Sequence, residues 1–337
     1  MQTSFNAYSY YGHTPLTAAM FSVKYEFTDN TPSLPTNMTE IGSQTYSTGN
    51  NAASTVHLYE YNNTLPLGFM VNMSTEANWN KETGNPFTTQ NSFVKTAIDS
   101  DANIFHQLQT TDTVGTFTAK YQLEEDDNYK PSGDAATYDV YFYCVTSSET
   151  LTVNITNGSI TDDNSTTKTF SSTNQNYICH VGNVSAGSTI TVTASDGQAL
   201  TTCYAYAFDN DAWETAYKLL NKNPYTVESY SDTKITGKVT AKKQGIMYTS
   251  IPYDKGWNVY VDRVKSKTTS ICSGALTGVL VEAGTHEITF KYTPKGLVPG
   301  IVITIICLLI FLGIIYQDNI INLISNKSKN NKVTSKK

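Results

Sequence analysis

The segment Tyr253-Asp-Lys-Gly-Trp257 places two aromatic rings and two opposite charges within five residues. Aromatic faces can stack on the C–H surfaces of sugars, because the rings are large, rigid and apolar with a polar edge. Asp254 and Lys255 can hydrogen-bond sugar hydroxyls or a phosphate. We therefore take Tyr253, Asp254, Lys255 and Trp257 as the candidate carbohydrate-binding residues.

A structural turn is the alternative interpretation of the same segment. Pro252 and Gly256 favour a turn, and Trp257 then begins a strand whose inward face also carries Val259 and Val261. The two charged residues would be solvated in that case. Strand alternation favours this alternative over a sugar site.

We find no motif for catalysis or metal binding elsewhere in the sequence. The histidines at positions 13, 57, 106, 180 and 286 are scattered, with no HExxH motif and no Ser/His/Asp elbow. The acidic runs 124–127 and 162–164 lack the alternating ligand spacing of a calcium loop, so we expect both to be solvated. We predict no catalytic residue, no metal ligand and no cofactor in this chain.

The cysteines indicate neither a zinc ribbon nor a disulfide scaffold, because no CxxC pair occurs among the five. Cys144, Cys179 and Cys203 lie in strand-like segments, where small buried hydrophobic side chains are the favoured interpretation. One disulfide among these three is left open.

An apolar run without charges extends from Leu297 to Tyr316, which is long enough to cross the hydrocarbon core of a membrane as a helix. After it come five lysines against one acid, Asp318. By the positive-inside rule, we expect the tail in the cytoplasm and residues 1 to about 295 outside.

The beginning of the chain has no basic and apolar leader that would export such a domain. We expect either a piece of a longer multi-span protein or a tail-anchored protein with its bulk in the cytosol. Composition and tail charge favour the first. Residues before 318 contain 18 Lys and Arg against 28 Asp and Glu, a net charge of −10 that argues against a nucleic-acid partner.

Alternating hydrophobic and polar residues predict many short strands from about residue 112 onward. The fold class is therefore mainly β, with tandem antiparallel β-sandwich or jelly-roll-like units. Asp209 caps a predicted helix in which Trp213, Tyr217 and Leu220 share one face. The predicted domains are a mixed α/β region (1–110), a β-sandwich (111–208), a linking helix (209–223), a second β-sandwich (224–295), a transmembrane helix (296–317) and a basic tail (318–337).

The segments 246–262 and 282–296, which lead directly into the apolar run, resemble the C-terminal end of the YfhO family of bacterial multi-pass membrane proteins. Similar pieces occur in the family's order across most of the chain, among them 8–15, 65–69, 85–91 and 230–237. One departure is Asp262-Arg263, where the family pattern has Asp-Gly. Because Arg does not favour positive φ, we expect a different turn type there.

The resemblance implies that this chain is the extracytoplasmic C-terminal domain and last span of a polytopic glycosyltransferase of the lipid-linked-sugar type, a family implicated in decorating wall polymers such as lipoteichoic acid. It also implies that the catalytic acids lie in loops between earlier membrane helices, outside this chain. The first hypothesis is thus a non-catalytic extracytoplasmic part in a bacterial plasma membrane, which recognises a wall polysaccharide or teichoic acid or braces the catalytic helices. The alternative is a membrane-anchored, wall-binding or adhesive surface protein without enzymatic activity.

Overall fold

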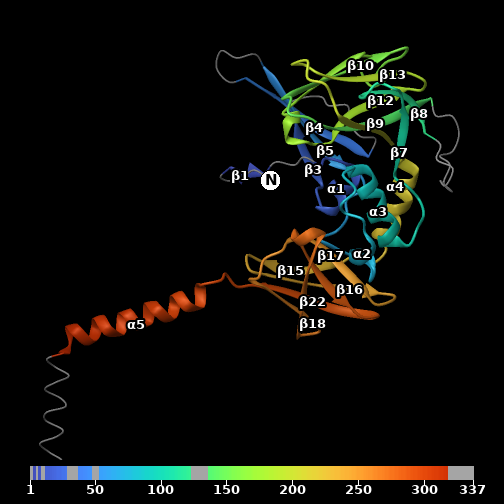
Figure 1. Cartoon of the computed structure of the whole chain (residues 1–337). Coiled ribbons are helices and arrows are strands. Elements are labelled where there is room, and N and C mark those ends of the chain that lie inside the picture. Colours follow the sequence, from blue (N-terminus) through green and yellow to red (C-terminus); the bar gives the residue numbers. More distant parts are fainter. Residues whose placement is uncertain are drawn as a thin grey trace, which may run out of the picture.

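The computed structural model describes residues 3–4, 7–8, 12–28, 37–47, 53–122 and 136–317. The acidic run 124–127 and the basic tail lie outside these ranges. The described chain is mainly β, and its paired strands are antiparallel, as predicted. Figure 1 shows an eight-stranded sheet at one end of the molecule and a five-stranded sheet towards the other, with helices between them.

The eight-stranded sheet has the order β11-β10-β13-β8-β7-β14-β9-β12. Its strands are β7 (Phe105–Thr110), β8 (Thr116–Tyr121), β9 (Thr137–Val145), β10 (Thr150–Thr156), β11 (Thr167–Ser171), β12 (Cys179–Ser185), β13 (Thr189–Ala194) and β14 (Thr202–Phe208). The predicted alternation is present on β10, where Leu151, Val153 and Ile155 are buried and the residues between them are not. Both halves of the sheet contribute side chains to one apolar core, so the sheet folds over itself.

A five-stranded sheet (β15-β16-β22-β18-β19) and a four-stranded sheet (β20-β21-β17-β6) enclose a second core. The strands are β15 (Thr226–Ser231), β16 (Lys234–Ala241), β17 (Gly245–Pro252), β18 (Trp257–Val261), β19 (Val264–Ser266), β20 (Thr268–Ile271), β21 (Leu276–Val281) and β22 (Gly284–Tyr292). Val259, Met247 and Phe290 are completely buried in this core. On β22, Ile288 and Phe290 are buried and the residues beside them are not, as period-two patterning requires.

Strand β6 (Gly68–Asn72) comes from the first part of the chain but pairs with β17 in the four-stranded sheet. The region predicted as mixed α/β thus shares a sheet with residues 245–281, while the predicted domain boundaries themselves stay a prediction. A three-stranded sheet joins β3 (Tyr25–Thr28), β5 (Ser54–Tyr61) and β4 (Met38–Tyr46), and β1 (Thr3–Ser4) pairs with β2 (Ala7–Tyr8).

Four helices of the described chain precede the apolar run: α1 (Pro15–Met20), α2 (Thr75–Asn78), α3 (Pro86–Ile98) and α4 (Asn210–Leu220). The helix predicted after Asp209 is confirmed as α4. Asp209 caps it, because its carboxylate accepts a hydrogen bond from the Ala212 N–H at 2.8 Å. Trp213 and Leu220 are buried on its inner face. Helices α1, α3 and α4 share a third apolar cluster with residues of both β units, so this cluster joins the two.

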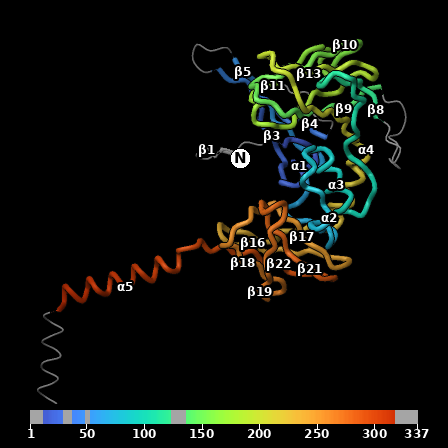
Figure 2. Tube along the Cα trace, in the orientation of Figure 1, coloured from blue at the N-terminus to red at the C-terminus, as the bar shows by residue number. Residues whose placement is uncertain are grey.

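Helix α5 (Leu297–Ile315) confirms the predicted apolar helix, and it is long and apolar enough to cross a membrane. None of its residues is buried against the rest of the described chain. Figure 2 shows it projecting away from the five-stranded sheet. Residues 293–296 are all that separate it from β22.

The turn between β18 and β19 differs from the expectation. Val261 pairs with Val264, so Asp262 and Arg263 form a two-residue hairpin loop, and their φ angles are 50° and 69°. Two positive φ angles are typical of a type I′ turn, whose backbone twist matches that of the flanking strands. The expectation of another turn type was therefore wrong: the twist of the hairpin prevails over the preference of Arg.

Cys144 on β9 and Cys203 on β14 form a disulfide between directly paired positions. The disulfide that the sequence left open is therefore present, and the favoured interpretation of these two residues as simple hydrophobic side chains was wrong, although Cys144 is buried. Cys179 is buried and free, and Cys272 is free and half-buried. The pairing partner depends on sheet register, which sequence spacing does not reveal.

Candidate functional site

The predicted turn Tyr253–Trp257 is held together by its own hydrogen bonds. Asp254 Oδ1 accepts from the Gly256 N–H at 2.6 Å, and the Trp257 N–H donates to the Asp254 carbonyl at 3.1 Å. The Tyr253 N–H donates to the Ala275 carbonyl at 2.9 Å. Asp254 and Lys255 are exposed, whereas Tyr253 and Trp257 are half-buried. The structure therefore brings the four candidate residues together in one turn.

The half-buried Trp257 ring packs against the apolar core between the five-stranded and four-stranded sheets. It lies 4.9 Å from the ring of Tyr292 and 6.3 Å from that of Phe290, measured between centroids. Val259 on the same strand face is completely buried. This geometry agrees with a structural role for Trp257, and sugar binding by the turn stays a prediction.

Each of the five histidines pairs with a different carboxylate. The closest N–O distances are 3.1 Å for His13–Glu26, 2.9 Å for His57–Glu40, 3.4 Å for His106–Asp209, 2.6 Å for His180–Asp139 and 2.7 Å for His286–Asp262. The pairs lie on separate strands and turns, so they do not converge on one reacting centre. Asp162 and Asp163 instead accept backbone hydrogen bonds, from Asn183 at 3.1 Å and Ser165 at 2.9 Å.

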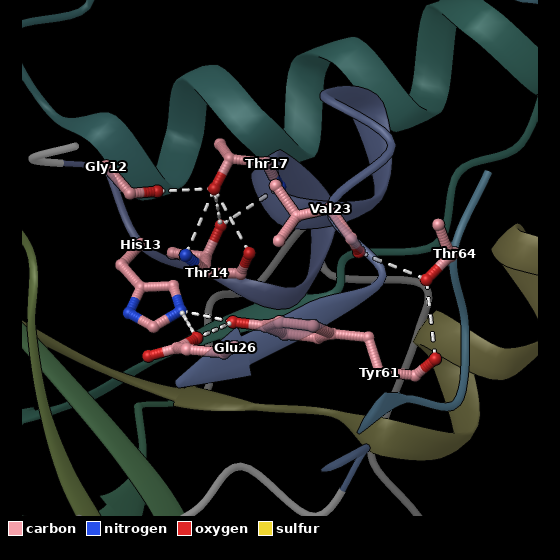
Figure 3. Close-up of polar contacts among 8 residues, drawn as sticks. All are labelled: Gly12, His13, Thr14, Thr17, Val23, Glu26, Tyr61 and Thr64. Carbon is pink, nitrogen blue, oxygen red and sulfur yellow. Dashed lines mark hydrogen bonds and ion pairs between the residues drawn. The ribbon is translucent and has the colours of Figure 1, made fainter. Parts of the chain in front are cut away.

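The pair His13–Glu26 belongs to a polar network with Tyr61, shown in Figure 3. The Tyr61 hydroxyl donates to Glu26 at 2.7 Å and also contacts His13. Burial alone would raise the pKa of Glu26, but the hydrogen bonds from His13 and Tyr61 outweigh it and lower that pKa. The network fixes the chain before α1 to β3 and β5, since Thr14 next to it caps α1.

Residues 85–91, one of the segments that resemble the YfhO family, hold helix α3 in place through hydrogen bonds within the protein. The Asn85 side chain accepts from the Phe87 N–H at 3.0 Å and donates to the Tyr206 hydroxyl at 3.0 Å. Asn91 Oδ1 accepts from the N–H groups of both Ile104 and Phe105, at 3.0 and 2.9 Å. These bonds satisfy buried backbone groups at the start of β7.

A cleft of about 530 Å³ opens where α1, the start of α3, β9 and the segment 272–276 meet. Its wall is mostly apolar and includes Leu16, Phe21, Trp79, Tyr143, Ile178 and Leu276. Clefts of this size with an aromatic wall and a few polar groups are the usual form of a small-ligand site. This cleft could not be predicted from the sequence, because its walls come from four distant segments and carry no local motif.

Lys81 supplies the positive charge of the cleft. Its ammonium lies 5.3 Å from the centroid of the Trp79 ring and donates to Glu76 Oε2 at 2.6 Å and to the Glu76 carbonyl at 3.1 Å. An ammonium has three N–H donors, so one remains for a ligand as far as the described residues show. A sugar ring could stack on the aromatic side chains of this cleft while one of its hydroxyl or phosphate groups accepts a hydrogen bond from Lys81.

Comparison with known proteins identifies the family. No curated protein and no solved structure matches the chain. The family model of the bacterial membrane protein YfhO matches residues 2–304, which is most of the chain and includes the cleft, the turn at 253–257 and the start of α5. The chain therefore belongs to the YfhO family of bacterial membrane proteins.

Proposed function

We propose that this chain is the extracytoplasmic C-terminal part of a YfhO-type protein that takes part in glycosylating wall polymers such as lipoteichoic acid. In this proposal the chain binds the acceptor polymer and does not itself transfer the sugar. The observation that carries the proposal is the cleft, in which the ammonium of Lys81 lies beside the Trp79 ring and Tyr143 forms another part of the wall. A glycerol-phosphate polymer bearing sugars offers both a ring to stack on and an anion for Lys81.

The disulfide supports the extracytoplasmic orientation. Disulfides persist in oxidising compartments and are rare in the cytosol, where thiols are kept reduced. The Cys144–Cys203 bond therefore fits residues 1 to about 295 outside the membrane and the lysine-rich tail inside. Protease added to intact protoplasts should digest the bulk and spare the tail. Protection of the bulk would refute the orientation.

Acceptor binding can be measured directly on the purified full chain in nanodiscs, with a glycosylated polyglycerol-phosphate oligomer as ligand. Trp79→Ala should weaken binding by about 1–3 kcal/mol, by analogy with aromatic stacking on bases. Phe27→Ala is the matched control, because Phe27 is 72% exposed on β3 and does not line the cleft. Unchanged affinity in Trp79→Ala, with the fold intact, would contradict the proposal.

Transfer of sugar provides a second measurement. The purified chain should transfer no sugar from a polyprenyl-phosphate donor, since the proposal places catalysis in other parts of the protein. Turnover by this chain alone, abolished by a point substitution within it, would overturn that part of the proposal. Polymer binding by a protein that proves unconnected to any transferase would instead favour the wall-binding surface protein.

A further inference from the structure

Charge is distributed very unevenly along this chain. Residues 224–295, which form most of the β unit next to α5, contain ten Lys and Arg against six Asp and Glu. Residues 1–223 contain eight against 22. All ten basic residues of the 224–295 unit are exposed. Within the residues before the predicted membrane span, the basic part is therefore the one closest to the span.

One end of the five-stranded sheet lies beside the start of α5. The Thr293 N–H donates to the Gly256 carbonyl at 3.0 Å, so the turn at 253–256 is fixed next to the segment that leads into the helix. Leu297 comes four positions after Thr293, a distance of at most about 14 Å even when fully extended. With α5 in the hydrocarbon core, this end of the sheet comes within reach of the lipid headgroups.

The residues at this end are basic and aromatic. We define the basic–aromatic end of the sheet by six residues: Tyr230, Lys234, Lys255, Lys291, Tyr292 and Lys295. Tyr230 is 84% exposed although it lies within a strand. The exposed carboxylates nearby are Asp232 and Asp254, and Asp254 is already hydrogen-bonded to the Gly256 N–H. Four cations against two carboxylates leave a net positive charge there.

Two of these cations face each other without a counter-charge. Lys234 on β16 and Lys291 on β22 are directly paired in the register, and neither forms an ion pair with any described residue. Like charges at directly opposed positions destabilise a sheet, so an external anion at this position would relieve the repulsion.

We propose that the basic–aromatic end docks on the anionic headgroups of the bilayer that α5 spans. Lysines near an anionic membrane surface contribute about 1 kcal/mol each, and Tyr and Trp rings favour the level of the headgroups. Phosphate is the shared chemistry of lipid headgroups and of teichoic polymers. The position directly before the span favours the lipid. The inference rests on the membrane span and not on acceptor binding in the cleft.

Lysine labelling tests the docking on the full chain. We compare acetylation rates in nanodiscs of phosphatidylcholine alone and of phosphatidylcholine with phosphatidylglycerol, read by mass spectrometry. Lys234 and Lys291 should be labelled about fivefold more slowly in the anionic nanodiscs, as about 1 kcal/mol per residue implies. Lys120, exposed on β8, is the internal control and should not change. High salt should abolish the difference, because it screens exposed charges.

Charge-matched variants identify the residues responsible. Lys234→Gln with Lys291→Gln should remove the lipid-dependent protection of Lys255, whereas Lys120→Gln with Lys222→Gln should keep it. Equal labelling rates of the unmodified chain in both nanodiscs would overturn the proposal, whatever the variants do. Protection by soluble polyglycerol phosphate without any effect of phosphatidylglycerol would also overturn it, and would assign the surface to the polymer.

Discussion

The carboxylate of Glu76 on α2 accepts a hydrogen bond from the backbone N–H of Cys272, 3.0 Å away and 196 residues later in the chain. The same carboxylate is ion-paired with Lys81 at 2.6 Å and accepts from the Tyr248 hydroxyl. One side chain thus connects the early helical region, the four-stranded sheet and the rim of the cleft.

Glu76 should make stability depend on acidity. Burial raises the pKa of Glu76, but the hydrogen bonds from Lys81, Tyr248 and Cys272 outweigh burial and lower it below 4.5. A carboxyl with a lowered folded pKa contributes stability above its unfolded pKa, and this contribution is lost as pH falls through the folded value. Glu76→Gln should lower the free energy of unfolding by about 1.5–3 kcal/mol at pH 7, the usual range for hydrogen bonds to a charged group.

The difference in free energy of unfolding between the wild type and Glu76→Gln should therefore shrink below about pH 4.5. Chemical denaturation across a pH series measures it. Glu214→Gln is the matched control, because Glu214 is an exposed partner in an i,i+4 pair on α4. That variant should stay within about 0.5 kcal/mol at every pH. A constant Glu76→Gln difference from pH 3 to pH 7 would contradict the assignment.

Replacing Asn91 should destabilise the protein. Its side chain accepts hydrogen bonds from the buried N–H groups of Ile104 and Phe105 and donates one to the buried Phe105 carbonyl. We expect Asn91→Ala to lower the free energy of unfolding by about 2–4 kcal/mol, since unpaired buried groups cost about 1–3 kcal/mol each. Asn80→Ala, at an exposed position, should change it by less than about 0.5 kcal/mol. Similar melting temperatures for the two variants would refute the structural role of the motif asparagine.

Arg263 should be a site where glycine stabilises the protein. Its φ of 69° places a side chain in the left-handed region, which costs an L-residue about 1–2 kcal/mol. Arg263→Gly should therefore raise the free energy of unfolding by about 1 kcal/mol. Arg263→Ala keeps the Cβ and removes the rest of the side chain, so the left-handed strain remains and no comparable gain should follow. Equal stability of the Gly and Ala variants would show that the turn is not strained at this residue.

Replacing Trp257 tests whether its ring packs in the protein core or binds sugar at the surface. Because the ring is half-buried against Tyr292 and Phe290, Trp257→Ala should cost about 2–3 kcal/mol, somewhat less than a fully buried aromatic residue. Tyr260→Ala, on the opposite face of β18, should cost less. An unchanged melting temperature together with weakened polymer binding would instead support the carbohydrate site at residues 253–257.

Local patterns in the sequence were sufficient for several elements. The alternation at Leu151, Val153 and Ile155 identified β10, and Asp209 with the spacing of Trp213 and Leu220 identified α4. The uncharged run identified α5. In each case the physical cause lies within one helix or one strand, so a single window of sequence contains the whole signal.

Long-range pairing could not be predicted in the same way. The partnership of Cys144 with Cys203 follows from the register of β9 and β14, and Glu76 meets Cys272 only because α2 packs beside the four-stranded sheet. The cleft is likewise assembled from four separate segments. At Asp262-Arg263 the residue type pointed to one turn, but strand twist imposed another.

The pairing of β6 with β17 has a consequence for biogenesis. Residues 68–72 reach their sheet partner only after residues 245–249 have been made, about 170 residues later in synthesis. At about 5–20 residues per second, the early strand waits roughly 10–35 seconds with an unpaired edge. During that interval its apolar residues Phe69 and Val71 are open to wrong partners. In the orientation proposed above, export of this chain would benefit from a holding factor that shields β6 until β17 has been made.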